Sequence, residues 1–167
     1  STVGLILSCC YPFMKRLIVL PQAFLGITFA WGIPMAYAAT INALPARCWL
    51  LYLANLLWVI AYDTQYAMAD KEGDIKLGLY SSAIFFGQFD RTMIAILQCL
   101  CLLLLIILGR QQSLAWPFYC GLVAASILAI HQQYRIKSRH PKACFQAFLN
   151  NHWLGFAIFI GLFFSLL

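Results

Sequence analysis

Long stretches without any formal charge constrain this chain more than any other feature of its sequence. Residues 17–46, 92–109, 111–134 and 143–167 contain no Asp, Glu, Lys or Arg, and residues 1–14 are also uncharged. About 20 mainly apolar residues are enough for a helix to cross a bilayer. Backbone polar groups in lipid must pair within the protein, so apolar runs of this length are expected to be helices. The sequence therefore predicts an all-α transmembrane fold.

The remaining span is expected around residues 48–68. Residues 48–62 alone are too few to cross, so we expect this helix to continue to about Met68, with Asp63 below the membrane surface. Pro21 suits a helix start, and Pro34 predicts a kink in the second span. The total is six membrane helices, the first truncated. The sequence shows no internal repeat or linker, which indicates a single transmembrane domain over residues 1–167.

The basic residues predict the topology. Nine of the eleven Lys and Arg residues fall in alternate loops on one side, and two fall on the other. The richer side is expected to be cytoplasmic, with the acidic loop facing the cytoplasm. Topology and contact with membrane lipid account for the net charge of +6, so nucleic-acid binding is not expected. The nine residues are Lys15, Arg16, Lys71, Lys76, Arg91, Arg135, Lys137, Arg139 and Lys142.

All five carboxylates of the chain lie between residues 63 and 90. On a continuous helix, at about 100° per residue, Asp63, Asp70 and Asp74 would share one face. Gly73 could instead end the helix just before Asp74. In either case Asp70 and Asp74 are spaced i, i+4, close enough to share one cation.

Grouped carboxylates at a membrane boundary are costly without a counter-charge. Mg²⁺ prefers carboxylate oxygens and usually also keeps waters or binds phosphate. Lys15 and Arg16 could hold an anion that the metal also holds, and a diphosphate fits both. Two other interpretations remain open from the residues alone. The acids could form a solvated loop, or Asp63 and Asp70 could belong to the ion pathway of a cation- or proton-coupled transporter.

Four segments carry a resemblance to a known family. The run YDTQYAMADKEGDIKLG, which starts at Tyr62, resembles the second aspartate motif of the UbiA intramembrane prenyltransferases. YPFMKRLIVLPQAFLG, from Tyr11, resembles their YxxxK region, and IPMAYAA and FLNNHWLG are also similar to family sequence. The resemblance implies a nine-helix bundle, of which six helices are here as the C-terminal part of a longer protein. Within the family, the likeness is greatest to the 4-hydroxybenzoate polyprenyltransferases.

The resemblance also implies a catalytic set. Asp70 and Asp74 match the DxxxD carboxylates that bind Mg²⁺ and, through it, the diphosphate. Asp63 matches an upstream family aspartate. The family's first aspartate motif, N-D-x-x-D-x-x-x-D, does not occur in these residues. Only half of the site is therefore expected here, and the chain alone is expected to be inactive.

Four further residues are expected at the diphosphate. Tyr11 and Lys15 match YxxxK, Arg16 lies beside them, and Lys76 is a further candidate contact. The implied reaction transfers a polyprenyl group from polyprenyl diphosphate to the ring of 4-hydroxybenzoate, in ubiquinone biosynthesis, at the bacterial inner membrane. A relative with another aromatic acceptor is the alternative.

An allylic cation formed in such a reaction would need a dry, electron-rich wall. The aromatic candidates for that wall are Phe29, Trp31, Tyr62 and Tyr66.

Overall fold

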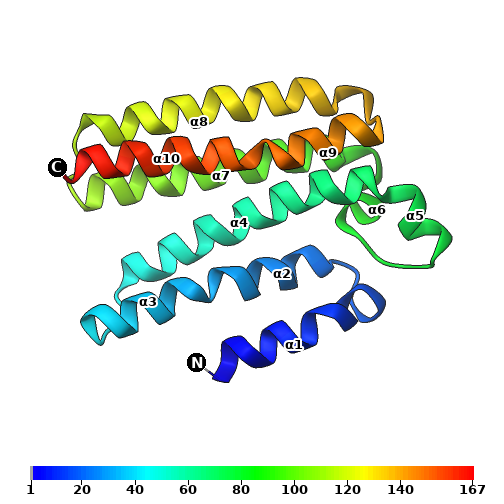
Figure 1. Cartoon of the computed structure of the whole chain (residues 1–167), viewed down its shortest axis with the longest axis horizontal. Coiled ribbons are helices and arrows are strands. Elements are labelled where there is room, and N and C mark those ends of the chain that lie inside the picture. Colours follow the sequence, from blue (N-terminus) through cyan, green and yellow to red (C-terminus); the bar gives the residue numbers. More distant parts are fainter. Residues whose placement is uncertain (1) are drawn as a thin grey trace.

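The structure, a computed structural model, describes residues 2–167, except for the side chains of Tyr11, Pro12 and Lys15. The described part of the chain is helical and contains no β-strand. Six long helical segments run back and forth between two ends, with short helices at one of them (Figure 1). The elements are α1 (Thr2–Leu17), α2 (Pro21–Ala30), α3 (Gly32–Ile41), α4 (Ala46–Ala69), α5 (Lys71–Lys76), α6 (Ser82–Phe86), η1 (Gly87–Phe89), α7 (Asp90–Gln111), α8 (Trp116–Arg135), η2 (Ile136–Ser138), α9 (Pro141–Leu149) and α10 (Asn151–Ser165).

Helix α4 is the centre of the arrangement. It packs against α2 on one side and against α7 and α9 on the other, while α8 and α10 pack on each other. Figure 1 shows α7, α8 and α9–α10 grouped above α4, with α2–α3 and then α1 below it. The acid-bearing end of α4 thus lies between the two groups of helices.

The predicted spans match these segments closely. Helix α4 continues to Ala69, as its apolar length predicts, and α2 starts at Pro21. The second span is interrupted at Trp31, three residues before Pro34, because the proline ring removes a helical N–H and clashes with the preceding turn. Among the described residues, three helical segments are long and apolar enough to cross a membrane, namely Pro21–Ile41, Ser82–Gln111 and Pro141–Ser165.

Close helix packing depends on glycine where α8 meets α10. A Cβ placed on Gly121 would lie 2.6 Å from the Ala157 carbonyl oxygen, and one on Gly161 would lie 2.9 Å from the Pro117 carbonyl oxygen. Small residues of this kind let two backbones approach in lipid, where van der Waals packing drives association. The backbones of α8 and α10 therefore lie in close contact at these two glycines.

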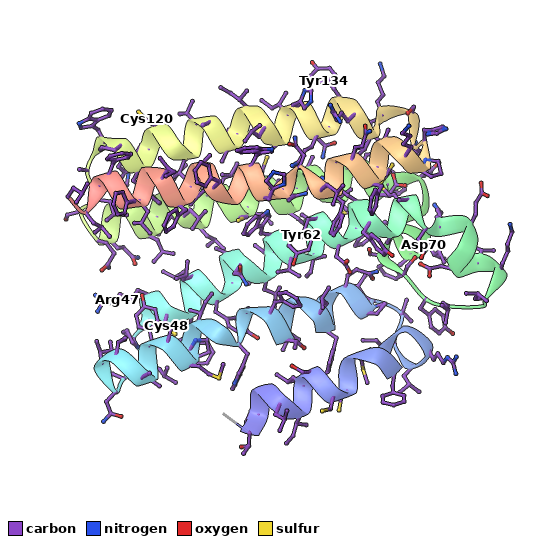
Figure 2. All side chains as sticks on the ribbon, viewed as in Figure 1. Arg47, Cys48, Tyr62, Asp70, Cys120 and Tyr134 are labelled. Carbon is purple, nitrogen blue, oxygen red and sulfur yellow. The ribbon has the colours of Figure 1, made fainter. Side chains whose placement is uncertain are left out.

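The loops with many basic residues all lie at the end of the bundle that carries α5 and α6 (Figure 1). The last turn of α1, the start of α7 and the α8–α9 connection are all at this end. Arg47 lies at the opposite end, and Figure 2 shows it far from Asp70. The acidic segment and the last turn of α1 therefore share one end, as the charge pattern predicts.

Candidate functional site

The helix that carries Asp63 is interrupted at Asp70. Asp70 adopts φ −101° and ψ 6°, and it separates α4 from α5. The expectation that Asp63, Asp70 and Asp74 share one face of a continuous helix is therefore wrong. The alternative, that Gly73 ends the helix, is also wrong, because Gly73 lies inside α5. Aspartate competes with the backbone for hydrogen bonds and favours helix ends, which explains a break at Asp70.

Asp70 and Asp74 nevertheless remain one turn apart. The Asp74 N–H donates to the Asp70 carbonyl oxygen at 2.9 Å. Asp70 is exposed, whereas Asp74 is only 2% exposed. A Cβ on Gly73 would lie 2.8 Å from Asp70 Oδ1, so the glycine leaves open space beside that carboxylate. The junction thus presents one carboxylate to water and a second one within the fold.

The loop after α5 is tied to two membrane helices. The Ser82 N–H donates to Oε1 of Gln22 on α2 at 2.8 Å, and the Ser82 hydroxyl lies 2.8 Å from that of Thr64 on α4. All three residues are buried. The Leu79 N–H also donates to the Asp74 carbonyl oxygen at 2.9 Å. These contacts hold the return of the acidic loop against the bundle and so fix the position of α5.

An aromatic cluster lies on the α4 and α9 side of this junction. Tyr62 and Tyr66 of α4 meet Phe145 and Phe148 of α9, with ring centroids 5.3 to 6.3 Å apart. These separations suit edge and tilted aromatic contacts. Tyr66 joins the cluster to the acids, because it comes one turn before Asp70 on α4. The tyrosines are thus placed beside the carboxylates by the helix itself.

A cavity of about 330 Å³ opens between α4 and α9 beside this cluster. Its lining combines a carboxylate, a lysine and aromatic rings. The lining residues are Tyr66, Ala69, Asp70, Pro141, Lys142 and Phe145. The other two aromatic candidates, Phe29 and Trp31, lie at the α2–α3 break and do not line it.

The proposed diphosphate contacts are partly described. Arg16 on α1 and Lys76 on α5 are both exposed at the end of the bundle that carries the acids. The side chains of Tyr11 and Lys15 lie outside the described residues. Asp63 is half-buried and precedes Asp70 by seven residues, about 10 Å along α4. Within residues 2–167 as described, no three His, Cys, Asp or Glu side chains converge on a point that could hold a metal ion.

Asp90, the fifth acid, forms an ion pair at some distance along the chain from the others. Its carboxylate is completely buried and accepts hydrogen bonds from Nη2 of Arg139 at 2.7 Å and from Nε at 3.0 Å. The Arg91 N–H donates to the same carboxylate at 2.7 Å. The hydrogen bond to Asp90 raises the pKa of Arg139. This pair clamps the α8–α9 connection onto the start of α7, a role that the sequence pattern did not indicate.

Comparison with characterised proteins gives consistent matches over nearly the whole chain. A 4-hydroxybenzoate octaprenyltransferase of Aeromonas hydrophila is 56% identical over 161 residues, which cover 96% of this chain and 56% of that protein. The enzyme of that name from Escherichia coli strain HS is 49% identical over 159 residues, 95% of this chain and 55% of that protein. The chain therefore spans about half the length of the curated relatives it matches.

A solved structure shows the same fold. The apo structure of a UbiA homologue from Aeropyrum pernix K1 superposes with a TM-score of 0.82 over 99% of this chain and 62% of that one, at 23% identity. The sequence model of the UbiA prenyltransferase family matches residues 1–164. Because the chain matches this family and has long apolar helices, it is part of an integral membrane protein. The chain belongs to the UbiA prenyltransferase family.

Proposed function

We propose that the natural protein carrying this chain transfers a polyprenyl group from polyprenyl diphosphate to the ring of 4-hydroxybenzoate. The product would be 3-polyprenyl-4-hydroxybenzoate, a precursor of ubiquinone. The observation that carries the proposal is 49–56% identity to 4-hydroxybenzoate octaprenyltransferases over at least 95% of the chain. The chain spans about half of each relative, so the activity is proposed for the whole protein, and these 167 residues alone are expected not to turn over.

The α4–α5 junction fits a hard divalent cation, and we assign Mg²⁺ to Asp70 and Asp74. Mg²⁺ is usually bound through one or two carboxylates together with waters and substrate phosphates, so two aspartates one turn apart are a sufficient protein contribution. The open space beside Asp70 Oδ1, which a side chain on Gly73 would fill, supports this assignment. When bound, the metal would neutralise charge on the diphosphate and make it a better leaving group.

The cations of the chain would hold the diphosphate beside these acids. Lys15 and Arg16 come from the last turn of α1, which lies at the acidic end of the bundle. Lys76 ends α5, two residues after Asp74, and Tyr11 lies one turn before Lys15 on α1. Arginine and lysine stabilise phosphate oxygens whose charge grows as the allylic C–O bond breaks. The cations and the metal-binding acids would thus together stabilise the departing diphosphate.

The aromatic cluster would protect the reacting carbon. As the C–O bond breaks, positive charge develops on the allylic carbon, and the faces of Tyr62 and Tyr66 could stabilise it. The neighbouring rings of Phe145 and Phe148 add apolar surface that would exclude water. The ring carbon ortho to the hydroxyl of 4-hydroxybenzoate then attacks the allylic carbon, and the same ring carbon loses its proton. We keep Asp63 in the catalytic set because it lies deeper along α4 than the metal ligands.

We place the protein in the bacterial inner membrane with the acidic loop in the cytoplasm. The support is the number of Lys and Arg residues, nine at the acidic end and two at the other. Thiol labelling of intact spheroplasts tests this orientation. In a background whose native cysteines are replaced by serine, a Lys76→Cys variant should react with an impermeant reagent only after lysis, whereas Arg47→Cys should react from outside. The opposite pattern would reverse the proposed topology.

The transferase itself is tested with the natural full-length protein in native membranes. Membranes are incubated with labelled 4-hydroxybenzoate and octaprenyl diphosphate, with Mg²⁺ or with EDTA, and the extracted lipid is analysed for prenylated acid. We expect product that depends on Mg²⁺ and that carries label from 4-hydroxybenzoate. Prenylation of a different aromatic acid, with none of 4-hydroxybenzoate, would keep the reaction class and overturn the acceptor. The absence of any prenylated product would overturn the proposed function.

A further inference from the structure

Four amide side chains form a buried relay across the bundle. They come from four different helices, Gln65 of α4, Gln98 of α7, Gln132 of α8 and Asn151 of α10, and each is at most 6% exposed. Gln132 Oε1 accepts hydrogen bonds from Gln65 Nε2 at 3.0 Å and from Gln98 Nε2 at 2.8 Å. Asn151 Nδ2 donates to Gln65 Oε1 at 2.7 Å. We call these four residues the amide relay.

The contacts of Asn151 determine, for each amide of the relay, which atom donates and which accepts. Trp58 Nε1–H donates to Asn151 Oδ1 at 3.3 Å, and Asn151 Nδ2 also reaches the carbonyl oxygens of residues 147 and 148. Those contacts leave only Nδ2 to face Gln65, so Gln65 must accept with its oxygen and donate with its nitrogen. Gln132 must then present its oxygen. Each amide therefore has one orientation, and the helices that carry them have one relative rotation.

Stability alone is a poor explanation for the relay. Side-chain hydrogen bonds between membrane helices contribute only about 0.6 kcal/mol on average. Among the described residues, Gln132 Nε2 is buried without an acceptor, and such a donor costs free energy. Apolar side chains of similar size would pack these helices without that cost. Amides add specificity, because only one relative arrangement of the four helices satisfies all of these hydrogen bonds.

The relay holds α4 through Gln65, which lies on the face of the helix opposite Asp63. Gln65 is two residues after Asp63, about 200° around the helix, so the two side chains point to opposite sides. Gln65 also comes immediately before Tyr66 and five residues before Asp70. A rotation of α4 by one residue position would turn these side chains by about 100°. The bond from Gln65 to α8 opposes such a rotation just before the acidic end.

We propose that the amide relay is a positioning device for the transferase, in which Gln65 holds α4 in the rotation that presents Asp63, Tyr66 and Asp70 to the reaction. This inference rests on the proposed function for its role in catalysis. The relay residues themselves are not expected to touch substrate. Their effect would be carried by α4 alone, which makes the bond of Gln65 more important for turnover than the bond of Gln98.

The chain offers a matched pair of variants. Gln65→Met removes both bonds that Gln65 makes in the relay, so near its acidic end α4 keeps no bond to it, and only Trp58, two turns earlier, still bonds Asn151. Gln132 still accepts from Gln98, and Asn151 still reaches two carbonyls. Gln98→Met removes the same kind of bond from α7 and leaves α4 attached. Neither change leaves a relay partner without a hydrogen bond, so both proteins should fold. The full-length variants are compared by unfolding midpoint in mixed micelles, by kcat and KM for octaprenyl diphosphate, and by hydrogen exchange over residues 66–76.

We expect equal unfolding midpoints for the two variants and a loss of turnover in Gln65→Met alone. Gln65→Met should lower kcat roughly 10- to 100-fold with little change in KM, because small misplacements of catalytic groups carry penalties of this size. It should also speed hydrogen exchange over residues 66–76. Gln98→Met should match the parent in both. Equal kcat and equal exchange in the two variants would overturn the proposal, as would a loss of turnover that follows stability alone. If the parent has no transferase activity, the exchange comparison still decides whether Gln65 positions α4.

Discussion

The ion pair between Asp90 and Arg139 predicts that removing the arginine costs more stability than neutralising the aspartate. Asp90 is completely buried, whereas the Arg139 side chain is 42% exposed. Arg139→Ala would leave a buried carboxylate whose remaining described hydrogen bond comes from the Arg91 N–H. Removing one partner of a buried pair typically costs 3–5 kcal/mol, and the exposure of Arg139 reduces this, so we expect about 2–3 kcal/mol. Asp90→Asn would leave a cation that water can reach, and it should cost about 1 kcal/mol.

The assay is equilibrium unfolding in mixed micelles, with Lys137→Ala as the control. Lys137 is exposed two residues from Arg139 in the same connection, so its removal should change stability by less than about 0.5 kcal/mol. The double variant Asp90→Asn with Arg139→Ala should be no less stable than Arg139→Ala alone, because the uncompensated charge is gone. If Asp90→Asn cost more than Arg139→Ala, or if the two costs were simply additive, the interpretation of this pair as a clamp around a buried acid would be wrong.

The pH dependence of the pair follows from the same contacts. The hydrogen bond to Asp90 raises the pKa of Arg139 above its ordinary value. A cation with a raised pKa contributes stability at every pH below its unfolded-state pKa and loses it only as the pH rises through the folded-state pKa. For arginine both values lie far above neutrality. The stability contributed by Arg139 should therefore stay constant between about pH 6 and 9.

Three further substitutions test the packing and the site. Gly161→Val should destabilise the protein by about 1–3 kcal/mol in the same micelle assay, because a side chain there presses on the backbone of α8 at 2.9 Å. Gln22→Leu removes the acceptor for the Ser82 N–H, and it should speed hydrogen exchange over residues 77–82 while exchange in α7 stays unchanged. Gly73→Ala places a Cβ 2.8 Å from a carboxylate oxygen of Asp70, and it should raise the Mg²⁺ concentration needed for half-maximal turnover. An unchanged Mg²⁺ requirement would argue against the assigned metal position.

Much of the fold could be predicted from the sequence because lipid imposes simple rules. The number of long helical segments, the start at Pro21 and the extension of α4 beyond Asp63 all followed from apolar length and proline chemistry. The common end of the acidic segment and the last turn of α1 followed from the positions of lysine and arginine. These are local or one-dimensional properties, so a single sequence contains them.

The site was predicted less completely because its geometry depends on tertiary contacts. Sequence spacing gave Asp70 and Asp74 as a pair, but not the break at Asp70 that exposes one carboxylate and buries the other. The pairing of Asp90 with Arg139 joins residues 49 positions apart, which no local pattern reveals. The amide relay could have been suspected, because a residue such as Gln65 is unusual inside an apolar span. Its partners on three other helices could not.

The assignment of Mg²⁺ to the α4–α5 junction is tested most directly by three variants of the natural full-length protein, Asp70→Asn, Asp74→Asn and Glu72→Gln. Glu72 is an exposed carboxylate on the same short helix, so Glu72→Gln removes an equal charge without touching the proposed ligands. Prenyl transfer to 4-hydroxybenzoate is measured for each variant as Mg²⁺ is increased. We predict that each Asn variant loses turnover roughly 100-fold or more, since several kcal/mol of leaving-group stabilisation would be lost, and that Glu72→Gln resembles the parent. Near-normal Mg²⁺-dependent turnover in both Asn variants, or an equal loss in Glu72→Gln, would contradict the account.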